Sequence, residues 1–193
     1  MDRPAEGMKL KKSVIVPRKG ISELKKVLEN NEGSAKVSFN EGFFTVQSEI
    51  PGANVTMGVR LVDGQFPDYN QVLPKEKKTT VTANRANLLS TIKRVALVTT
   101  DRSKTIKVDI AGNNMTLSSS SPEYGEALEA IEIEKDGDDV SIGFSARYLI
   151  DLLSTMSSEE QVNINLNGEL GPGIFLGDSD SNYRSVVMPM RFE

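Results

Sequence analysis

The stretch Lys-Thr-Thr-Val-Thr-Ala, residues Lys78–Ala83, begins the pattern that decides the fold of this chain. Its β-branched side chains favour a strand, and Asn84, which follows, can cap the first turn of a helix. Shorter alternating runs come next and are typical of strands, with a Ser-rich connection through Pro122 expected between the last two. These residues predict one β-α-β-β-β unit with the following apolar positions: Leu88, Leu89, Ile92, Val95 and Ala96 in the helix, and Ile106, Val108, Ile110, Met115, Leu117, Ile131 and Ile133 in the strands.

The same order of elements recurs on both sides of this unit. Upstream, Ser13–Val16 is a β-branched run, a helical pattern spans Arg18–Asn30, and three strands end near Leu61. Downstream, the strand Val140–Phe144 precedes a helix for which Ser145 is the expected N-cap, and further strands close the chain. Self-similarity at a period of about 60 residues indicates an internal repeat. We therefore predict an α+β protein built from three repeats of a β-α-β-β-β unit.

Composition argues against several classes of function. The chain of 193 residues is long enough to bury a core, and its 38% hydrophobic and 26% charged residues are ordinary for a globular protein. It has no cysteine and no histidine, which removes disulfides, thiolate chemistry, the commonest general base and the commonest metal ligands. The sequence has no phosphate-binding glycine loop and no apolar run of membrane-spanning length. We expect a cytoplasmic protein that is not an enzyme and uses no cofactor.

Charge separates between the predicted helices and the strands, although the net charge is only −4. The second helix carries Arg85, Lys93 and Arg94 and no acid, and Arg18 and Lys19 open the first helix. A basic helix face attracts a phosphate backbone without reading base sequence. The alternative is a set of ordinary solvated helix faces.

The chain ends on an apolar segment, whereas chain termini are normally polar. Residues Ser185–Glu193 read Ser-Val-Val-Met-Pro-Met-Arg-Phe-Glu. Pro189 cannot donate a ladder hydrogen bond, so a strand is expected to end there or to run at a sheet edge. Methionine suits a surface that repacks around a bound guest. The segment is therefore either a last strand packed into its own core or one wall of an apolar groove.

Two acidic clusters leave open a third class of function, a metal-binding or hydrolytic protein. Asp136, Asp138 and Asp139 form one cluster, and Asp178 and Asp180 form the other. Carboxylates are the hard oxygen ligands that Ca²⁺ prefers. Neither cluster has the spacing and glycine of an EF-hand, so we expect solvated turns and no metal site.

Three stretches taken together resemble the bacterial DNA polymerase III β subunit, the sliding clamp. They are Ser-Val-Ile-Val-Pro-Arg-Lys-Gly at Ser13–Gly20, Leu-Val-Asp-Gly-Gln-Phe-Pro-Asp-Tyr at Leu61–Tyr69, and Val-Val-Met-Pro-Met-Arg at Val186–Arg191. The resemblance covers essentially the whole chain, and it implies the DNA clamp fold, in which each domain consists of two β-α-β-β-β halves.

The resemblance also implies a domain organisation. Residues 1–74 are similar to the second half of the middle clamp domain, and residues 75–193 to a complete C-terminal domain. On this expectation the chain is a fragment, the product of an internal start, or a shortened paralogue. An uncovered half domain is expected either to form a homodimer through residues 13–61 or to leave residues 1–74 locally disordered.

The resemblance implies three kinds of site. Arg18 and Lys19 match positions that face DNA, and helix-face charge adds Arg85, Lys93 and Arg94. Leu97 and Val98 match the contact between subunits, with packing on their own sheet as the alternative. Gln71 stands where well-known members have an arginine. The positions that match the peptide-binding groove are Pro67, Gln71, Val72, Ser145, Tyr148, Gly173, Val186, Val187, Met188, Pro189, Met190 and Arg191.

The function implied is that of a non-catalytic processivity factor, or a fragment of one, on double-stranded DNA. Its implied partners are the polymerase III α subunit, the clamp loader and repair polymerases, which bind through short apolar peptides. A second copy of the chain or a full-length clamp is a further expected partner. The alternative is a shortened regulatory protein that does not encircle DNA and competes for the partners of the clamp.

Overall fold

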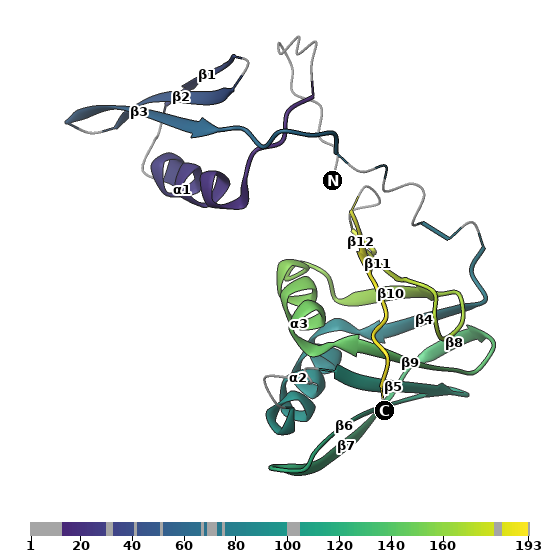
Figure 1. The fold of residues 1–193 in the computed structure, drawn as a ribbon. Coiled ribbons are helices and arrows are strands. Elements are labelled where there is room, and N and C mark those ends of the chain that lie inside the picture. The colour runs from purple at the N-terminus through teal and green to yellow at the C-terminus, as the bar shows by residue number, and fades with distance from the viewer. Residues whose placement is uncertain are drawn as a thin grey trace. The chain divides into compact units, whose positions relative to one another are not determined.

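The computed structural model describes residues 13–29, 33–40, 42–50, 52–66, 68, 73–74, 76–99, 105–179 and 183–192. It divides into two compact units, a smaller one within residues 4–68 and a larger one that holds residues 69–193. Figure 1 shows the elements of both, and each unit is described by itself.

The smaller unit is one helix on a three-stranded antiparallel sheet. Its elements are α1 (Arg18–Glu29), β1 (Ala35–Phe39), β2 (Phe43–Ile50) and β3 (Ala53–Arg60), with the strands in the order β1-β2-β3. The turn between β1 and β2 closes on Asn40, whose side-chain oxygen accepts hydrogen bonds from the backbone of Gly42 (3.1 Å) and Phe43 (2.7 Å).

The prediction of a strand at Ser13–Val16 is wrong, because no regular strand forms there. Only an isolated antiparallel bridge forms there, between Ile15 and Val62, through a 2.9 Å bond from the Val62 amide to the Ile15 carbonyl. Pro17 follows without an amide hydrogen, so the ladder cannot continue, and α1 begins at Arg18.

The core of the smaller unit is small. Phe44, Val46 and Val59 are its buried apolar residues among the described positions, and the Phe39 ring lies 4.9 Å from that of Phe44. Gly20 allows α1 to approach β3 closely, because a Cβ there would lie 2.4 Å from Cγ1 of Val59.

The larger unit contains two antiparallel sheets and two helices. One sheet has the strand order β12-β11-β10-β4-β8 and the other β7-β6-β5-β9, while α2 and α3 contact each other. The elements are β4 (Thr79–Asn84), α2 (Arg85–Val95), the 3₁₀ turn η2 (Ala96–Val98), β5 (Thr105–Ala111), β6 (Asn114–Ser121), β7 (Gly125–Glu132), β8 (Glu134–Gly137), β9 (Val140–Ser145), α3 (Ala146–Thr155), β10 (Gln161–Leu166), β11 (Gly173–Gly177) and β12 (Arg184–Val187).

One buried apolar cluster joins both sheets to both helices. Ile92 and Leu153 contribute from the two helices, and Val81 and Ile106 from the two sheets, all at most 1% exposed. Asn84 caps α2 as predicted, since its side-chain oxygen accepts a 2.9 Å bond from the Asn87 amide. Ser145 occupies the N-cap position of α3, but its side chain makes no capping hydrogen bond, which corrects that part of the prediction.

One further expectation for the larger unit is wrong, and one strand of this unit was not predicted. The Ser-rich connection is part of strand β6, because Ser119 and Ser121 alternate inward behind Leu117, and the Ser119 hydroxyl donates to the Val95 carbonyl at 2.6 Å. Strand β8 was not predicted, since its sequence, Glu-Lys-Asp-Gly, has no apolar alternation. It forms because it pairs with β4 at the edge of the five-stranded sheet.

Candidate functional site

The C-terminal segment belongs partly to the core and partly to the surface. In β12, Val186 pairs with Ile174 and Val187 with Gly173, and Val187 is buried. The strand then ends, and Met188 is 58% exposed. The last strand therefore packs into the core through Val187, and the methionine after it is exposed. That this exposed part forms a wall of a groove stays a prediction.

Beyond the strand, the chain continues as an exposed apolar surface. Pro189 is half-buried, Met190 is 39% exposed, and Arg191 is exposed. The Met190 amide donates a 2.8 Å hydrogen bond to the Gly143 carbonyl of β9, so this part of the chain lies against the second sheet.

Helix α3 presents an aromatic side chain and packs against β12. Tyr148 of α3 is 61% exposed although its helix carries four buried residues. The two elements are tied by hydroxyl groups, with Thr155 and Tyr183 at 3.0 Å and the Ser185 hydroxyl donating to Tyr183 at 3.0 Å. These hydrogen bonds thus link the C-terminal end of α3 to the start of β12.

Two predicted groove residues have a clear packing role. A Cβ at Gly173 would lie 2.8 Å from Cζ of Phe144, a ring that meets Phe175 edge-on at 6.1 Å, so only glycine fits there without a shift. Ser145 is buried at the start of α3. The positions Pro67, Gln71 and Val72 lie outside the described residues.

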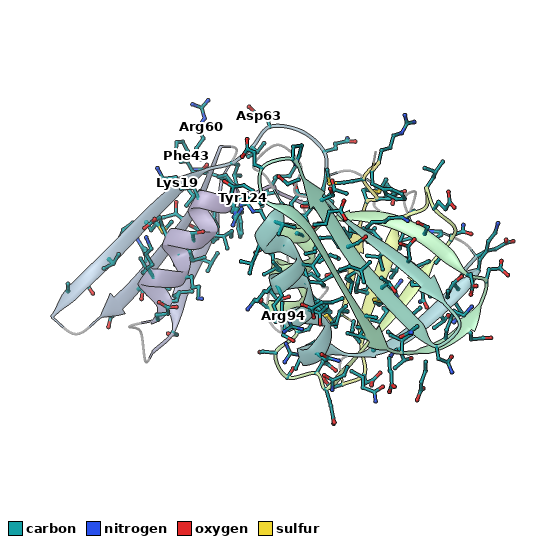
Figure 2. The ribbon with its side chains drawn as sticks, turned by 90° about the horizontal axis from the view of Figure 1, so that it is seen from below. Lys19, Phe43, Arg60, Asp63, Arg94 and Tyr124 are labelled. Carbon is teal, nitrogen blue, oxygen red and sulfur yellow. The ribbon has the colours of Figure 1, made fainter. Side chains whose placement is uncertain are left out.

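Arg94, labelled in Figure 2, lies on α2, and an acid from another element binds it. Its Nε and Nη2 donate to the two carboxylate oxygens of Glu129 on β7, at 2.7 and 2.6 Å. The hydrogen bonds and the opposite charge lower the pKa of Glu129 and raise the pKa of Arg94. Helix α2 carries no acid of its own, yet this cation is partly neutralised by β7, a pairing across 35 residues that no local pattern indicates.

Arg85 has a structural contact that its charge alone did not predict. Its Nε donates to the Glu159 carbonyl at 2.8 Å, and its Nη1 donates to the Leu153 carbonyl at 3.1 Å. The guanidinium therefore satisfies carbonyl groups at and beyond the C-terminal end of α3, where a cation is also favoured by the helix dipole.

The remaining predicted cations are at the surface. Lys93 is exposed on α2, and Arg18 and Lys19 are exposed in the first turn of α1, which has no acidic residue. Cations at a helix N-terminus do not stabilise the helix, because the dipole is positive there. Figure 2 shows Lys19 together with Phe43 and Arg60, which pair across β2 and β3.

The predicted subunit-contact residues follow α2 in the 3₁₀ turn. Leu97 is 78% exposed and Val98 is half-buried, so Leu97 does not pack on its own sheet. Strand β7, which this turn contacts, is an edge strand and exposes Leu128 at 69%. Exposed leucines beside an open strand edge are features typical of a protein interface.

Members of the acidic clusters accept hydrogen bonds from neighbouring strands and turns. Asp139 accepts from the Lys135 ammonium and from the Gly112 amide, and these bonds lower its pKa. Asp178 accepts from the Asn163 side chain at 2.5 Å, and Asp180 lies outside the described residues. Among the described positions, no group of three potential metal ligands occurs. Within the same part of the chain, no helix has the length and apolar character needed to cross a membrane.

Repeated β-α-β-β-β units and a two-sheet, two-helix domain with an exposed C-terminal segment define a clamp-type α+β protein. Residues 70–191 match the model of the DNA polymerase III beta subunit, C-terminal domain, and residues 3–68 match that of the central domain. The chain therefore belongs to the DNA polymerase III beta subunit family, as its sequence motifs predicted.

Relatives of known name support the assignment. The beta sliding clamp of Pseudomonas putida is 34% identical over 180 residues, which are 92% of this chain and 47% of the relative. That of Haemophilus influenzae is 29% identical over 93% of this chain and 48% of its own length. The chain thus spans about half the length of the curated relatives it matches.

Solved structures agree in fold. A DNA polymerase sliding clamp from Pseudomonas aeruginosa superposes with a TM-score of 0.83 at 31% identity, covering 93% of this chain and 48% of that one. The DNA polymerase III beta subunit of Thermotoga maritima gives a TM-score of 0.81 at 29% identity, with the same two coverages. The predicted clamp fold is confirmed.

Proposed function

We propose that this chain acts in a non-catalytic DNA sliding clamp of the cytoplasm, a processivity factor that tethers polymerases and repair factors to DNA. The observation that carries the proposal is the exposed segment Met188–Met190, which follows β12, the strand that packs on α3 and its exposed Tyr148. Flexible thioether side chains beside an aromatic one suit the binding of short apolar peptides. The resemblance of the sequence motifs to sliding clamps makes such peptides the expected guests.

The proposed groove takes its remaining residues from both sides of this segment. Ser145, Gly173, Val186, Val187 and Arg191 contribute with Pro67 and Val72, and the expected partners are the polymerase III α subunit, the clamp loader and repair polymerases. Gln71 would give this groove a neutral contact where well-known members have a cation. Peptides that depend on an anionic side chain at that point should bind less tightly than purely apolar ones.

The groove is tested by titrating a fluorescein-labelled Ala-Leu-Ala-Leu-Phe peptide and following its anisotropy. Tyr148→Ala and Met188→Ala should each weaken binding by about tenfold or more, as expected for side chains at the centre of an interface. Tyr124→Ala is the matched control, because Tyr124 is 63% exposed, against 61% for Tyr148, and precedes β7 rather than following β9. Equal binding by all four proteins would contradict the groove.

We further propose that exposed helix cations contact duplex DNA without sequence preference. Arg18, Lys19 and Lys93 carry this contact, and Arg94 and Arg85 contribute less because their guanidinium groups already bind Glu129 and backbone carbonyls. Lys93→Glu should lower duplex affinity and reduce the slope of log affinity against log salt by about one. Lys36→Glu makes the same charge change on the exposed surface of β1 and should leave the slope unchanged.

Encirclement separates the main proposal from the alternative of a shortened regulatory protein. A clamp that is completed by further subunits should remain on nicked circular DNA and leave it after linearisation. A regulatory protein would do neither and would only compete for peptides.

In the proposed assembly Leu97 and Val98 contact another subunit, which is a second copy of the chain or a full-length clamp. Leu97→Asp should therefore lower the mass of the assembly measured by ultracentrifugation.

The domain assignment is part of the same proposal. Residues 1–74 would form the second half of the middle domain, and residues 75–193 the complete C-terminal domain. The division of the chain between residues 68 and 69 and the two family matches on either side of it support this arrangement.

A further inference from the structure

The C-terminal segment joins the two sheets of the larger unit. Strand β12 ends at Val187 in the five-stranded sheet, and three residues later the Met190 amide donates to the Gly143 carbonyl at 2.8 Å. Gly143 lies in β9, the edge strand of the four-stranded sheet. In Figure 1 the segment leaves β12 and crosses β9 and β5 on its way to the C-terminus. The exposed Met188 is therefore held from both ends, by one sheet before it and the other after it.

Gly143 leaves the space that this crossing requires. A Cβ at this position would lie 2.3 Å from the Met190 carbonyl oxygen, 2.7 Å from Cδ1 of Phe192 and 3.3 Å from Cγ2 of Thr105. The first of these is a backbone atom, so a side chain at residue 143 would displace the segment itself. Gly143 is not among the glycines with positive φ, so the conformation of β9 does not by itself require glycine. The close approach of the C-terminal segment does.

Strand β5 makes further contacts with the same segment. Lys107 pairs with Gly143 and Thr105 with Ser145 across the β5–β9 ladder. The Thr105 hydroxyl approaches the Met190 sulfur at 3.8 Å, and the Lys107 ammonium lies 5.4 Å from the centre of the Phe192 ring, within cation–π range. Lys107 is in turn held by Asp109 at 2.9 Å. We call Gly143, Thr105 and Lys107 the tail seat.

We propose that the tail seat positions the C-terminal wall of the peptide groove, and that Gly143 and Lys107 act as positioning residues through their contacts with Met190 and Phe192. This inference rests on the proposed function. Met188 and Pro189 follow the end of the strand, so their placement depends on the anchors at Val187 and Met190. If this segment is already ordered in the free protein, peptide binding does not have to supply the conformational entropy lost on ordering it. The peptide therefore binds more tightly.

The test compares two Gly→Ala substitutions. Gly143→Ala should free the segment, so that the Met190 amide exchanges with solvent rapidly while the amides of the β5–β9 ladder remain protected. Affinity for the Ala-Leu-Ala-Leu-Phe peptide should then fall about tenfold, the cost of ordering one or two side chains at an interface. Gly58→Ala is the matched control, because nothing lies within 4 Å of the added Cβ and its φ is not positive.

Phe192→Ala and Lys107→Met provide a second route that leaves β9 unchanged. Both should raise the exchange rate of the Met190 amide, and both should lower the peptide affinity by a smaller factor than Gly143→Ala does. If Gly143→Ala also disrupts the β5–β9 ladder, these two variants decide the question.

The outcomes separate the inference from the function on which it rests. A Met190 amide that remains protected in Gly143→Ala, or in both other variants, would overturn the tail seat. Free exchange with unchanged peptide affinity would overturn the positioning role and leave the groove intact. If the wild-type protein binds no peptide, the proposed function and the positioning role fail together, and rapid Met190 exchange in Gly143→Ala would still support the tail seat.

Discussion

In the larger unit, α2 and α3 contact each other, and apolar residues from two sheets meet them in one buried cluster. In the smaller unit, α1 packs on a three-stranded sheet alone, with Phe44, Val46 and Val59 as the buried apolar residues that are described. The smaller unit also exposes Phe43 at 49% and Ile21 at 49%. Two repeats together therefore bury a large apolar cluster, whereas the described residues of the single repeat bury a small one.

The largest effect should come from removing a side chain that only the two-repeat core can bury. Leu153 of α3 is fully buried, and Leu153→Ala should cost about 2–5 kcal/mol, through lost burial and the cavity left behind. Guanidinium unfolding followed by circular dichroism measures the loss, and amide exchange should show it in β5 and β9 but not in β2. A uniform loss of protection across both units would contradict their independence.

A second, smaller effect should be confined to the smaller unit. Gly20→Ala places a Cβ at 2.4 Å from a methyl of Val59, a stiff β-branched residue, and should cost about 1–3 kcal/mol by overpacking. Exchange at β2 and β3 amides should accelerate while α2 and β5 are unaffected. Gly58→Ala, which meets open space, should leave both units unchanged.

A third prediction concerns pH and applies to the larger unit alone. The buried carboxylate of Glu159 accepts hydrogen bonds from the hydroxyl and the amide of Ser179, the latter at 2.8 Å, and these bonds lower its pKa from an ordinary value of 4.5. Because the folded pKa is depressed, its stabilising contribution is full above the unfolded value and is lost as pH falls through the folded value.

Glu159→Gln should therefore reduce stability at pH 7 and reduce it by less at an acidic pH below 4.5, where the wild-type contribution decreases. Urea unfolding at the two pH values measures the difference, and the smaller unit should show none. Equal losses at both pH values would mean that the Ser179 contacts do not depend on the charge of Glu159.

Repetition made the fold predictable, because three runs of the same apolar periodicity reinforce one another. Elements that form through strand pairing, without an apolar periodicity in their own sequence, were not predicted. Strand β8 has no apolar alternation, and in β6 the buried Ser119 satisfies its hydroxyl at the Val95 carbonyl, a partner that the sequence does not indicate. Local pattern does describe the change from buried Val187 to exposed Met188, since Pro189 marks the strand end.

The partners of the candidate site residues could not be read from the sequence in the same way. Glu129 meets Arg94 across 35 positions, and Met190 meets Gly143 across two sheets. Such contacts depend on how the sheets are placed, and a glycine in a strand does not reveal which segment approaches it. The charge pattern of α2 therefore predicted more unpaired cations than the structure shows, because Arg85 and Arg94 have partners. No pattern in the sequence indicated the tail seat.

The smallest effect tests whether helices in the two units offer comparable cations to DNA. On α1, Lys19 is exposed at the helix start, while on α2, Arg94 is held by both oxygens of Glu129. Glu129→Gln removes the negative charge and keeps the size of the side chain, so stability should change little, as for exposed ion pairs in general. The guanidinium then becomes available to a phosphate group of the DNA. Duplex affinity measured by anisotropy should increase, and the slope of log affinity against log salt should steepen by about one.

Glu126→Gln is the control, because it makes the same charge change on β7 at a residue that is not the partner of Arg94. If both variants strengthen binding equally, the gain reflects net charge alone, and Arg94 has no specific role on a DNA-facing surface.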